Sequence, residues 1–275
     1  MKHMLSALAT MQVAVIGAAM AAAASPPAPR VVAHRGRTDL SEPENSLRTM
    51  RHSIAQGVTM VEMDLKPGRD GTLYLLHDED LDRTTDGHGL LAALADADAA
   101  RVHLKDGTGR VTDETLVSFD SVARWAAAEP RAHLMLDIKK TSPAAIIPIV
   151  RAHRLTDRVL VLTFDPAMAR AAFAADPDWR VSVFVPDIDA FSTYRAMAGG
   201  HPMTAYIPTF APASLFRAVH AAGVPIVTDA MMPVPTGTLD DHARKAGSGV
   251  YRDYLAGRPV DIFVSDRATH VLASR

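Results

Sequence analysis

The chain has 275 residues, 48% of them hydrophobic, which is enough apolar surface for one large domain or two small ones. It contains no cysteine, which excludes a disulfide framework, and a domain of this size does not need one. The formal net charge is -2 at pH 7, with residues of both signs interspersed. Because the sequence has no basic tract, it does not indicate a nucleic-acid partner.

The amino terminus has the pattern of an export signal. Lys2 precedes a charge-free run from Met4 to Ala24, which ends in small residues and leads into a Pro-rich stretch. This order predicts a signal peptide over 1–24 and an exported protein, periplasmic or secreted. An uncleaved membrane anchor is the alternative, because the run approaches the ~20 residues of a bilayer span. We expect no transmembrane segment in 25–275, which we predict to be one domain.

Short β-branched runs then alternate with helical patterns. Leu47, Met50 and Ile54 recur at helical spacing before Gly57, which predicts a helix that ends there. Eight strands alternating with helices predict a (β/α)₈ TIM barrel. A doubly wound sheet is disfavoured because no Gly-rich loop follows the first strand. The strands are expected at 31–35, 59–66, 132–139, 158–164, 180–185, 204–208, 225–230 and 260–266.

One segment departs from this alternation. Residues 71–89 predict an additional strand and a turn-rich loop after the second barrel strand, and residues 90–115 continue as a modest insertion above the barrel. We therefore expect a small insertion at about 71–115 rather than a second domain.

Carboxylates share one face of the second predicted strand. Glu62 and Asp64 alternate with apolar residues, and Asp137 and Lys139 repeat the pattern on the next barrel strand, which brings Asp137 towards the first pair. Like charges this close require a proton or a cation between them. Three carboxylates without soft ligands predict a site for Mg²⁺ or Ca²⁺. The alternative is an ion-pair cluster that Lys139 and Arg35 neutralise without metal.

Two histidines follow strands at the same end of the predicted barrel. His34 ends the first strand and precedes Arg35, and His77 ends the additional strand. An imidazole titrates near neutral pH, so two that face one cavity are able to donate and accept a proton. With Arg35 and a cation nearby to stabilise an anionic transition state, the set predicts phosphoester chemistry.

The motifs AHRG, SEPENS, VEMDLK, LLHDEDLDRTTDGHG, LMLDIK and VDIFVSDR occur in this order between Val31 and Arg267. This series resembles that of the glycerophosphodiester phosphodiesterase family. The resemblance implies a TIM barrel with a small insertion. It also implies a phosphoric diester hydrolase whose small-molecule substrates, deacylated phospholipids, yield glycerol 3-phosphate and an alcohol.

The resemblance also implies roles for individual residues. The set comprises catalytic His34, His77 and Arg35, phosphate-binding Arg35 and Lys139, metal-binding Glu62, Asp64 and Asp137, and supporting Glu44 and Asn45. Asn45 stands directly before a predicted helix, so an N-cap role is an equal alternative. Either histidine is suited to act first, and the nucleophile is water or the glycerol 2-hydroxyl. No oligomeric state is predicted.

Two departures from the family pattern bear on the substrate. Asp137 stands where the family commonly has Glu, and the late stretch IVTDAMMPVPTG lacks a Trp that the family often shows. Asp229 is a candidate to bind a substrate hydroxyl, or else a solvated strand-end residue. The run Met231, Met232, Pro233 and Val234 either forms an apolar lip for a lipid chain or packs over the barrel mouth.

These departures leave two alternative functions open. One is a phosphodiesterase directed at lysophospholipids or other lipids, and the other is a catalytically silent binding protein on the same barrel. A glycosidase is disfavoured, since a carboxylate pair does not account for two histidines, an arginine and a third acid.

Overall fold

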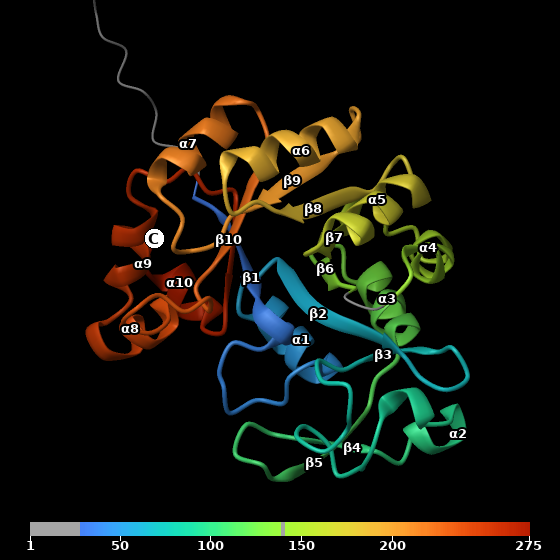
Figure 1. The fold of residues 1–275 in the computed structure, drawn as a ribbon. Helices are drawn as coiled ribbons and strands as arrows, with labels where there is room; N and C mark the ends of the chain where they lie inside the picture. Colours follow the sequence, from blue (N-terminus) through green and yellow to red (C-terminus); the bar gives the residue numbers. More distant parts are fainter. Residues whose placement is uncertain (1–27, 139–140) are drawn as a thin grey trace, which may run out of the picture.

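Eight parallel strands form a closed barrel in the computed structural model, which describes residues 28–138 and 141–275. β1 pairs with both β2 and β11, and this pairing closes the ring. The predicted TIM barrel is therefore confirmed (Figure 1). In spatial order the strands are β1 (Arg30–Ala33), β2 (Met60–Pro67), β6 (His133–Asp137), β7 (Val159–Thr163), β8 (Arg180–Phe184), β9 (Met203–Tyr206), β10 (Ile226–Asp229) and β11 (Ile262–Ser265).

Helices surround this ring (Figure 1). α1 ends as predicted, since Gly57, with a φ of 93°, follows its last turn. Short 3₁₀ turns also occur at η1 (His34–Gly36) and η3 (Thr156–Arg158). The helices outside the barrel are α1 (Leu47–Ala55), α3 (Phe119–Ala128), α4 (Pro143–Ala152), α5 (Pro166–Ala175), α6 (Ile188–Ala198), α7 (Ala213–Ala221), α8 (Leu239–Ala246), α9 (Gly249–Leu255) and α10 (Ala268–Ala273).

Alternation along the strands divides the core into two layers. Residues such as Val61 and Met63 point outward and pack with the helices in one large apolar cluster. The intervening residues point into the barrel, where a second cluster fills its middle. This inner cluster consists of Val32, Met60, Met135, Leu160, Leu162, Tyr206, Val227, Ile262 and Val264. The two ends of the barrel are thereby separated from each other by packed side chains.

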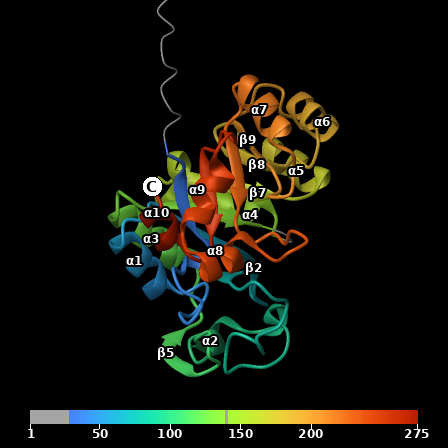
Figure 2. The same cartoon turned by 90° about the vertical axis from the view of Figure 1, so that its left-hand side faces the viewer.

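An insertion follows β2 and protrudes from the barrel (Figures 1 and 2). Its first strand pairs antiparallel with β2, and two later strands form a separate hairpin. A third apolar cluster, which includes Leu81 and Leu104, stabilises it. The predicted insertion is confirmed. Its elements are β3 (Leu73–Leu75), η2 (Leu91–Ala93), α2 (Asp96–Ala99), β4 (His103–Lys105) and β5 (Val111–Thr115).

Within the two described ranges, none of the helices is both long and apolar enough to cross a membrane. The predicted signal peptide, 1–24, lies outside the described residues, and so does Lys139.

Candidate active site

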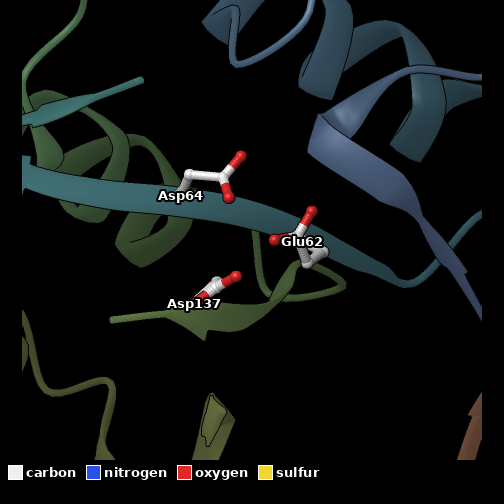
Figure 3. A group of neighbouring side chains, drawn as sticks. All are labelled: Glu62, Asp64 and Asp137. Atoms are coloured by element: carbon white, nitrogen blue, oxygen red, sulfur yellow. The ribbon is translucent and has the colours of Figure 1, made fainter. Parts of the chain in front are cut away.

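Three carboxylates meet inside the barrel near the carboxyl ends of β2 and β6. Asp64 lies opposite Asp137 in the parallel register, and Glu62 lies one inward-facing position earlier on β2. All three side chains are buried, and one oxygen from each lies within 4.8 Å of the others. Figure 3 shows the three groups directed into one space. The predicted approach of Asp137 to the pair on β2 is thus confirmed, and the shorter Asp side chain reaches the cluster.

The electrostatics of this cluster favour a bound cation. Burial raises the pKa of Glu62 to about 8, and the charges of Asp64 and Asp137 contribute to the rise. The donors are all carboxylate oxygens, the type that a hard divalent ion prefers. Glu62, Asp64 and Asp137 therefore fit the predicted Mg²⁺ or Ca²⁺ site.

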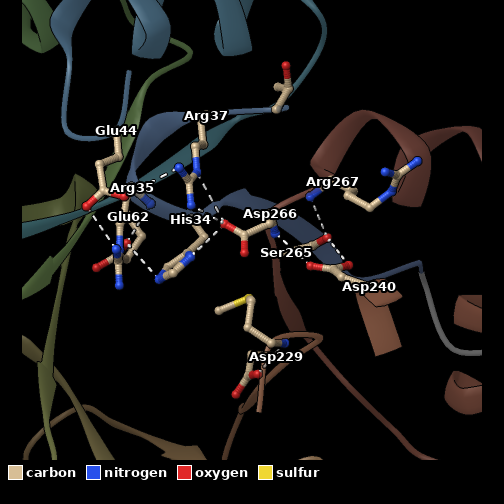
Figure 4. A network of polar contacts seen from close by, with 12 residues as sticks. His34, Arg35, Arg37, Glu44, Glu62, Asp229, Asp240, Ser265, Asp266 and Arg267 are labelled. Carbon is tan, nitrogen blue, oxygen red and sulfur yellow. Dashed lines mark hydrogen bonds and ion pairs between the residues drawn. The ribbon is translucent and has the colours of Figure 1, made fainter. Parts of the chain in front are cut away.

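His34 lies beside this cluster in a fixed orientation. Its Nδ1 is 2.9 Å from Oδ1 of Asp266, and its Nε2 is 3.9 Å from Oε2 of Glu62 (Figure 4). Burial lowers the pKa of His34. The hydrogen bond to Asp266 and the charge of Glu62 together raise this pKa by more than burial lowers it, so the net shift is upward. Because Asp266 holds Nδ1, the other ring nitrogen remains directed towards the carboxylates.

A tight turn after β1 presents the next residue to the same cluster. Arg35 adopts a positive φ of 51° and donates its backbone N–H to Oε2 of Glu62 over 2.7 Å. Its Nε lies 3.6 Å from Oδ2 of Asp64. Gly36 follows with a φ of 76°, and a Cβ there would lie 2.4 Å from Cγ of Met50. The sequence His34-Arg35-Gly36 therefore permits a turn that a larger third residue would obstruct.

Asn45 supports the cluster rather than a helix end. Its Nδ2 donates to Oδ2 of Asp64 over 2.9 Å, and its Oδ1 accepts the backbone N–H of Asp64 over 3.2 Å. Ser46 is the N-cap of α1, since its hydroxyl accepts from the N–H of Thr49. The N-cap alternative for Asn45 is therefore wrong, because its side chain points into the barrel.

Glu44 gathers three arginines at the barrel mouth. It forms ion pairs with Arg35 at 2.9 Å, Arg83 at 2.8 Å and Arg37 at 3.4 Å. Burial raises the pKa of Glu44, but the bond to Arg83 and the surrounding guanidinium groups lower it by more, so this carboxylate stays ionised. Glu44 thus holds positive charge beside the carboxylate cluster.

His77 lies two residues beyond β3 and is linked to the same network. Its Nδ1 is 2.7 Å from Oδ1 of Asp78. Arg83 contacts Asp78 over 2.5 Å and also bonds to Glu44. A continuous series of hydrogen bonds and ion pairs therefore runs from His77 on the insertion to the residues around β1.

Asp229, at the end of β10, is buried rather than solvated. Its Oδ2 accepts from the hydroxyl of Tyr206 over 2.9 Å, and its Oδ1 accepts the backbone N–H groups of Met231 and Met232. The interpretation of Asp229 as a solvated strand-end residue is wrong, because this turn encloses the carboxylate. Its position fixes the two methionines over the barrel mouth.

The rim above β7 to β10 is apolar. Phe164 packs on Phe184 and Tyr206, with ring centroids 6.2 and 5.5 Å apart. Met231 and Met232 pack on the inner cluster that contains Tyr206. Phe164 and Phe210 remain 39% and 60% exposed. The mouth therefore has a charged side around β1 and β2 and an apolar side opposite it.

Several polar residues of the site were not identified from the sequence. Asp266 directly follows the last barrel strand, and its backbone N–H donates to Asp240, which also accepts from Ser265 (Figure 4). Arg83 occurs within the motif LLHDEDLDRTTDGHG and Arg37 directly follows AHRG, but spacing alone did not show that they converge on Glu44. An acid directly after a barrel strand is the signal that could have identified Asp266.

Comparison with known proteins matches this chain to one protein family. The model of the glycerophosphoryl diester phosphodiesterase family matches residues 34–251, which is more than half of the chain. Glycerophosphodiester phosphodiesterase 1 of Rattus norvegicus is 44% identical over 63 residues, which are 23% of this chain and 19% of that protein. A glycerophosphodiester phosphodiesterase of Caldanaerobacter subterraneus is 38% identical over 61 residues, 22% of this chain and 25% of that protein. The chain thus spans about a fifth to a quarter of the length of these curated relatives.

Solved structures share the fold at low sequence identity. A glycerophosphoryl diester phosphodiesterase from Parabacteroides distasonis superposes with a TM-score of 0.79 at 23% identity, covering 91% of this chain and 87% of that one. A phosphodiesterase from Oleispira antarctica, solved with its product sn-glycerol-3-phosphate, gives 0.74 at 20% identity and covers 90% and 96% of the two chains. At these identities the likeness establishes the barrel fold.

Proposed function

We propose a function for this chain from the family to which it belongs, the glycerophosphoryl diester phosphodiesterase family. In this proposal the chain hydrolyses glycerophosphodiesters to glycerol 3-phosphate and a free alcohol, and the reaction depends on a divalent cation. The observation that carries this proposal is the position of His34, held by Asp266 at one ring nitrogen and directed towards three buried carboxylates by the other.

The charged side of the mouth binds the phosphodiester in this proposal. Arg35, and Lys139 by its resemblance to the family, neutralise the phosphate oxygens. Glu62, Asp64 and Asp137 would hold Mg²⁺ or Ca²⁺, which would supply Lewis-acid stabilisation of the developing negative charge. Asn45 and Arg35 maintain the orientation of Asp64.

The two histidines transfer the protons. Asp266 accepts from Nδ1–H of His34, which leaves Nε2 to exchange a proton with the nucleophile or the leaving group. Asp78 orients His77 in the same way. One imidazole removes a proton from water or from the glycerol 2-hydroxyl, and the other protonates the departing alkoxide.

A panel of phosphodiesters tests this proposal. Purified protein is incubated with glycerophosphocholine, glycerophosphoethanolamine, glycerophosphoinositol and lysophosphatidylcholine in the presence of Mg²⁺ or Ca²⁺. Released glycerol 3-phosphate is quantified with a coupled assay. Release that requires the cation supports the proposal. If neither glycerol 3-phosphate nor lysophosphatidic acid forms from any substrate, the result favours a binding protein on the same barrel.

A lysophospholipid phosphodiesterase is the second candidate, and the apolar rim favours it. An acyl chain attached to the glycerol would extend from the charged side onto exposed Phe164 and Phe210. Product analysis distinguishes the candidates, because a lysophospholipid cleaved on the head-group side yields lysophosphatidic acid rather than glycerol 3-phosphate.

Residues 1–24 direct export in this proposal. The pattern of a basic start, an apolar run and a small-residue exit supports this role. Amino-terminal sequencing of the exported protein tests it, since cleavage near Ala24 gives a new terminus and an uncleaved anchor does not.

A further inference from the structure

A second polar site occupies the opposite end of the barrel, where the strands begin. A pocket of about 310 Å³ opens there. Its wall includes Arg30, His133 and Arg180, the first residues of β1, β6 and β8. Arg158, directly before β7, completes a group of three arginines and one histidine. The packed inner cluster separates this pocket from the carboxylates at the other end.

The arginines of this pocket are not paired with acidic side chains of the described residues. Among the described residues, no ion pair joins Arg30, Arg158 or Arg180 to a carboxylate. Arg158 bonds instead to three backbone carbonyls near the end of α3, those of Ala126, Glu129 and Ala132. Burial and the charge of Arg180, which lines the same pocket, lower the pKa of Arg30. The pocket therefore gathers three guanidinium groups, none of which is ion-paired to a carboxylate of the described chain.

Two acidic residues line the same pocket without pairing with these arginines. Asp157 lies next to Arg158 in the sequence, and Asp261 accepts the backbone N–H of Ile226 over 2.7 Å. The Asp261 carboxylate is thus hydrogen-bonded to the backbone at the start of β10 rather than paired with Arg30 or Arg180.

A buried hydroxyl in the same wall also lacks a partner. Thr204 on β9 is 1% exposed, and its Oγ1 makes no hydrogen bond within the described chain. Thr204 lines the pocket, opposite Ser182 in the register of β8 and β9. A buried hydroxyl without a hydrogen-bond partner carries a free-energy cost. An unpaired hydroxyl beside a cationic pocket therefore indicates a ligand that accepts a hydrogen bond from it.

We propose that this pocket binds a phosphate group, either as inorganic phosphate or as the head group of an anionic phospholipid. Guanidinium forks match the oxygens of a phosphate, and several positive groups around one cavity favour an anion. Arg30 and Arg180 bind the oxygens, and the Thr204 hydroxyl donates to one of them. This site is independent of the proposed hydrolysis at the other end of the barrel.

Thermal unfolding in phosphate tests the proposal. The chain is freed of divalent cations with a chelator, and its Tm is measured as phosphate increases while chloride keeps the ionic strength constant. A ligand that binds only the folded state raises the Tm with its concentration. We expect phosphate to raise the Tm of the wild type and to have a much smaller effect on an Arg30→Gln/Arg180→Gln variant. Arg170→Gln, which removes an exposed arginine from α5, serves as the control and should respond like the wild type.

Thr204 gives a second, more conservative test. Thr204→Val keeps the shape but removes the unpaired hydroxyl, so the Tm without phosphate should not fall. We expect phosphate to bind this variant about tenfold more weakly, the factor for the loss of one hydrogen bond to a charged group. Thr204→Ser should restore the affinity. Calorimetric titration with inorganic phosphate measures these changes.

Vesicles distinguish the two sources of phosphate. Co-sedimentation with phosphatidylglycerol but not phosphatidylcholine vesicles, lost in the Arg30→Gln/Arg180→Gln variant, identifies a lipid head group. Stabilisation by soluble phosphate without sedimentation identifies the free ion. The proposal is overturned if the wild type and this variant respond alike to phosphate and to vesicles, or if chloride alone reproduces the effect of phosphate.

Discussion

Asp266 and His34 are 232 residues apart in the sequence, and Oδ1 of Asp266 lies 2.9 Å from Nδ1 of His34. The closed barrel explains this contact, because β1 and β11 are neighbours and both residues follow the carboxyl ends of these strands. Burial raises the pKa of Asp266. The hydrogen bond to His34 and nearby positive charges lower this pKa by more than burial raises it, so the net shift is downward. Asp266 is therefore an ionised acceptor that selects the His34 tautomer with the proton on Nδ1.

Asp266→Asn should preserve the fold and lower kcat/KM by about 10²-fold or more, since general acid–base catalysis contributes about 10²–10⁴-fold. The charge of Asp266 raises the pKa of His34, so its removal should lower that pKa. The limb of the pH–rate profile that reports His34 should then move to lower pH. A variant with a reduced rate but an unshifted profile would contradict this role for Asp266.

We expect substitution of the two histidines to cause the largest loss of turnover. We expect His34→Ala and His77→Ala each to abolish nearly all turnover, because each removes a proton donor or acceptor. Circular dichroism and thermal unfolding establish that both variants are folded. His88→Ala, which removes an exposed imidazole from the insertion, is the matched control. Near-normal rates in either of the first two variants would disprove the acid–base assignment.

Removal of divalent cations should abolish activity. The buried carboxylates repel one another without a cation, so Mg²⁺ or Ca²⁺ should restore activity after dialysis against a chelator and should also raise the Tm. Asp137→Asn should lose both responses, and Asp137→Glu should retain part of each. Unchanged activity in the chelator would instead favour an ion-pair cluster without metal.

The alternation of residues in the strands was sufficient to predict the barrel and the meeting of Glu62, Asp64 and Asp137. Side-chain direction follows directly from position in a strand, and all eight predicted strands occur in the structure. The role of Asn45 was harder to predict, because an Asn directly before a helix also fits an N-cap. Only the positive φ of Asn45 and its contact with Asp64 distinguish its actual role.

Contacts made by long side chains could not be derived in this way. Arg37 and Arg83 come from different loops and reach Glu44 through flexible side chains, whose direction no local pattern determines. Asp229 is enclosed by the turn that follows it, so its burial depended on a loop conformation that the sequence did not specify.

The apolar rim should determine the preference for acylated substrates. We expect Phe164→Ala and Phe210→Ala together to lower kcat/KM for a lysophospholipid by about tenfold or more, because an acyl chain loses apolar contact with two exposed rings. The same variant should cleave glycerophosphocholine at nearly the wild-type rate. Val111→Ala removes an exposed apolar residue from the insertion and is the control. Equal effects on both substrates would exclude the rim as an acyl-binding surface.

His133 should make the stability of the protein depend on pH. Burial lowers its pKa to about 4, and the charges of Arg30, Arg158 and Arg180 contribute to this shift. In the unfolded chain the imidazole has an ordinary pKa near 6.5, so between about pH 6.5 and pH 4 the unfolded state binds more protons than the folded state. The free energy of unfolding should therefore decrease as the pH falls through this window.

His133→Gln should make that decrease shallower, because the glutamine side chain does not titrate. Urea unfolding at a series of pH values from 7.5 to about 4.5 measures the slope, in buffers without phosphate so that no anion occupies the adjacent pocket. His220→Gln, at an exposed position of α7, controls for the loss of an imidazole from the surface. Since the effect is a difference in proton binding between two states, equal slopes for His133→Gln and the wild type would show that His133 does not contribute to it.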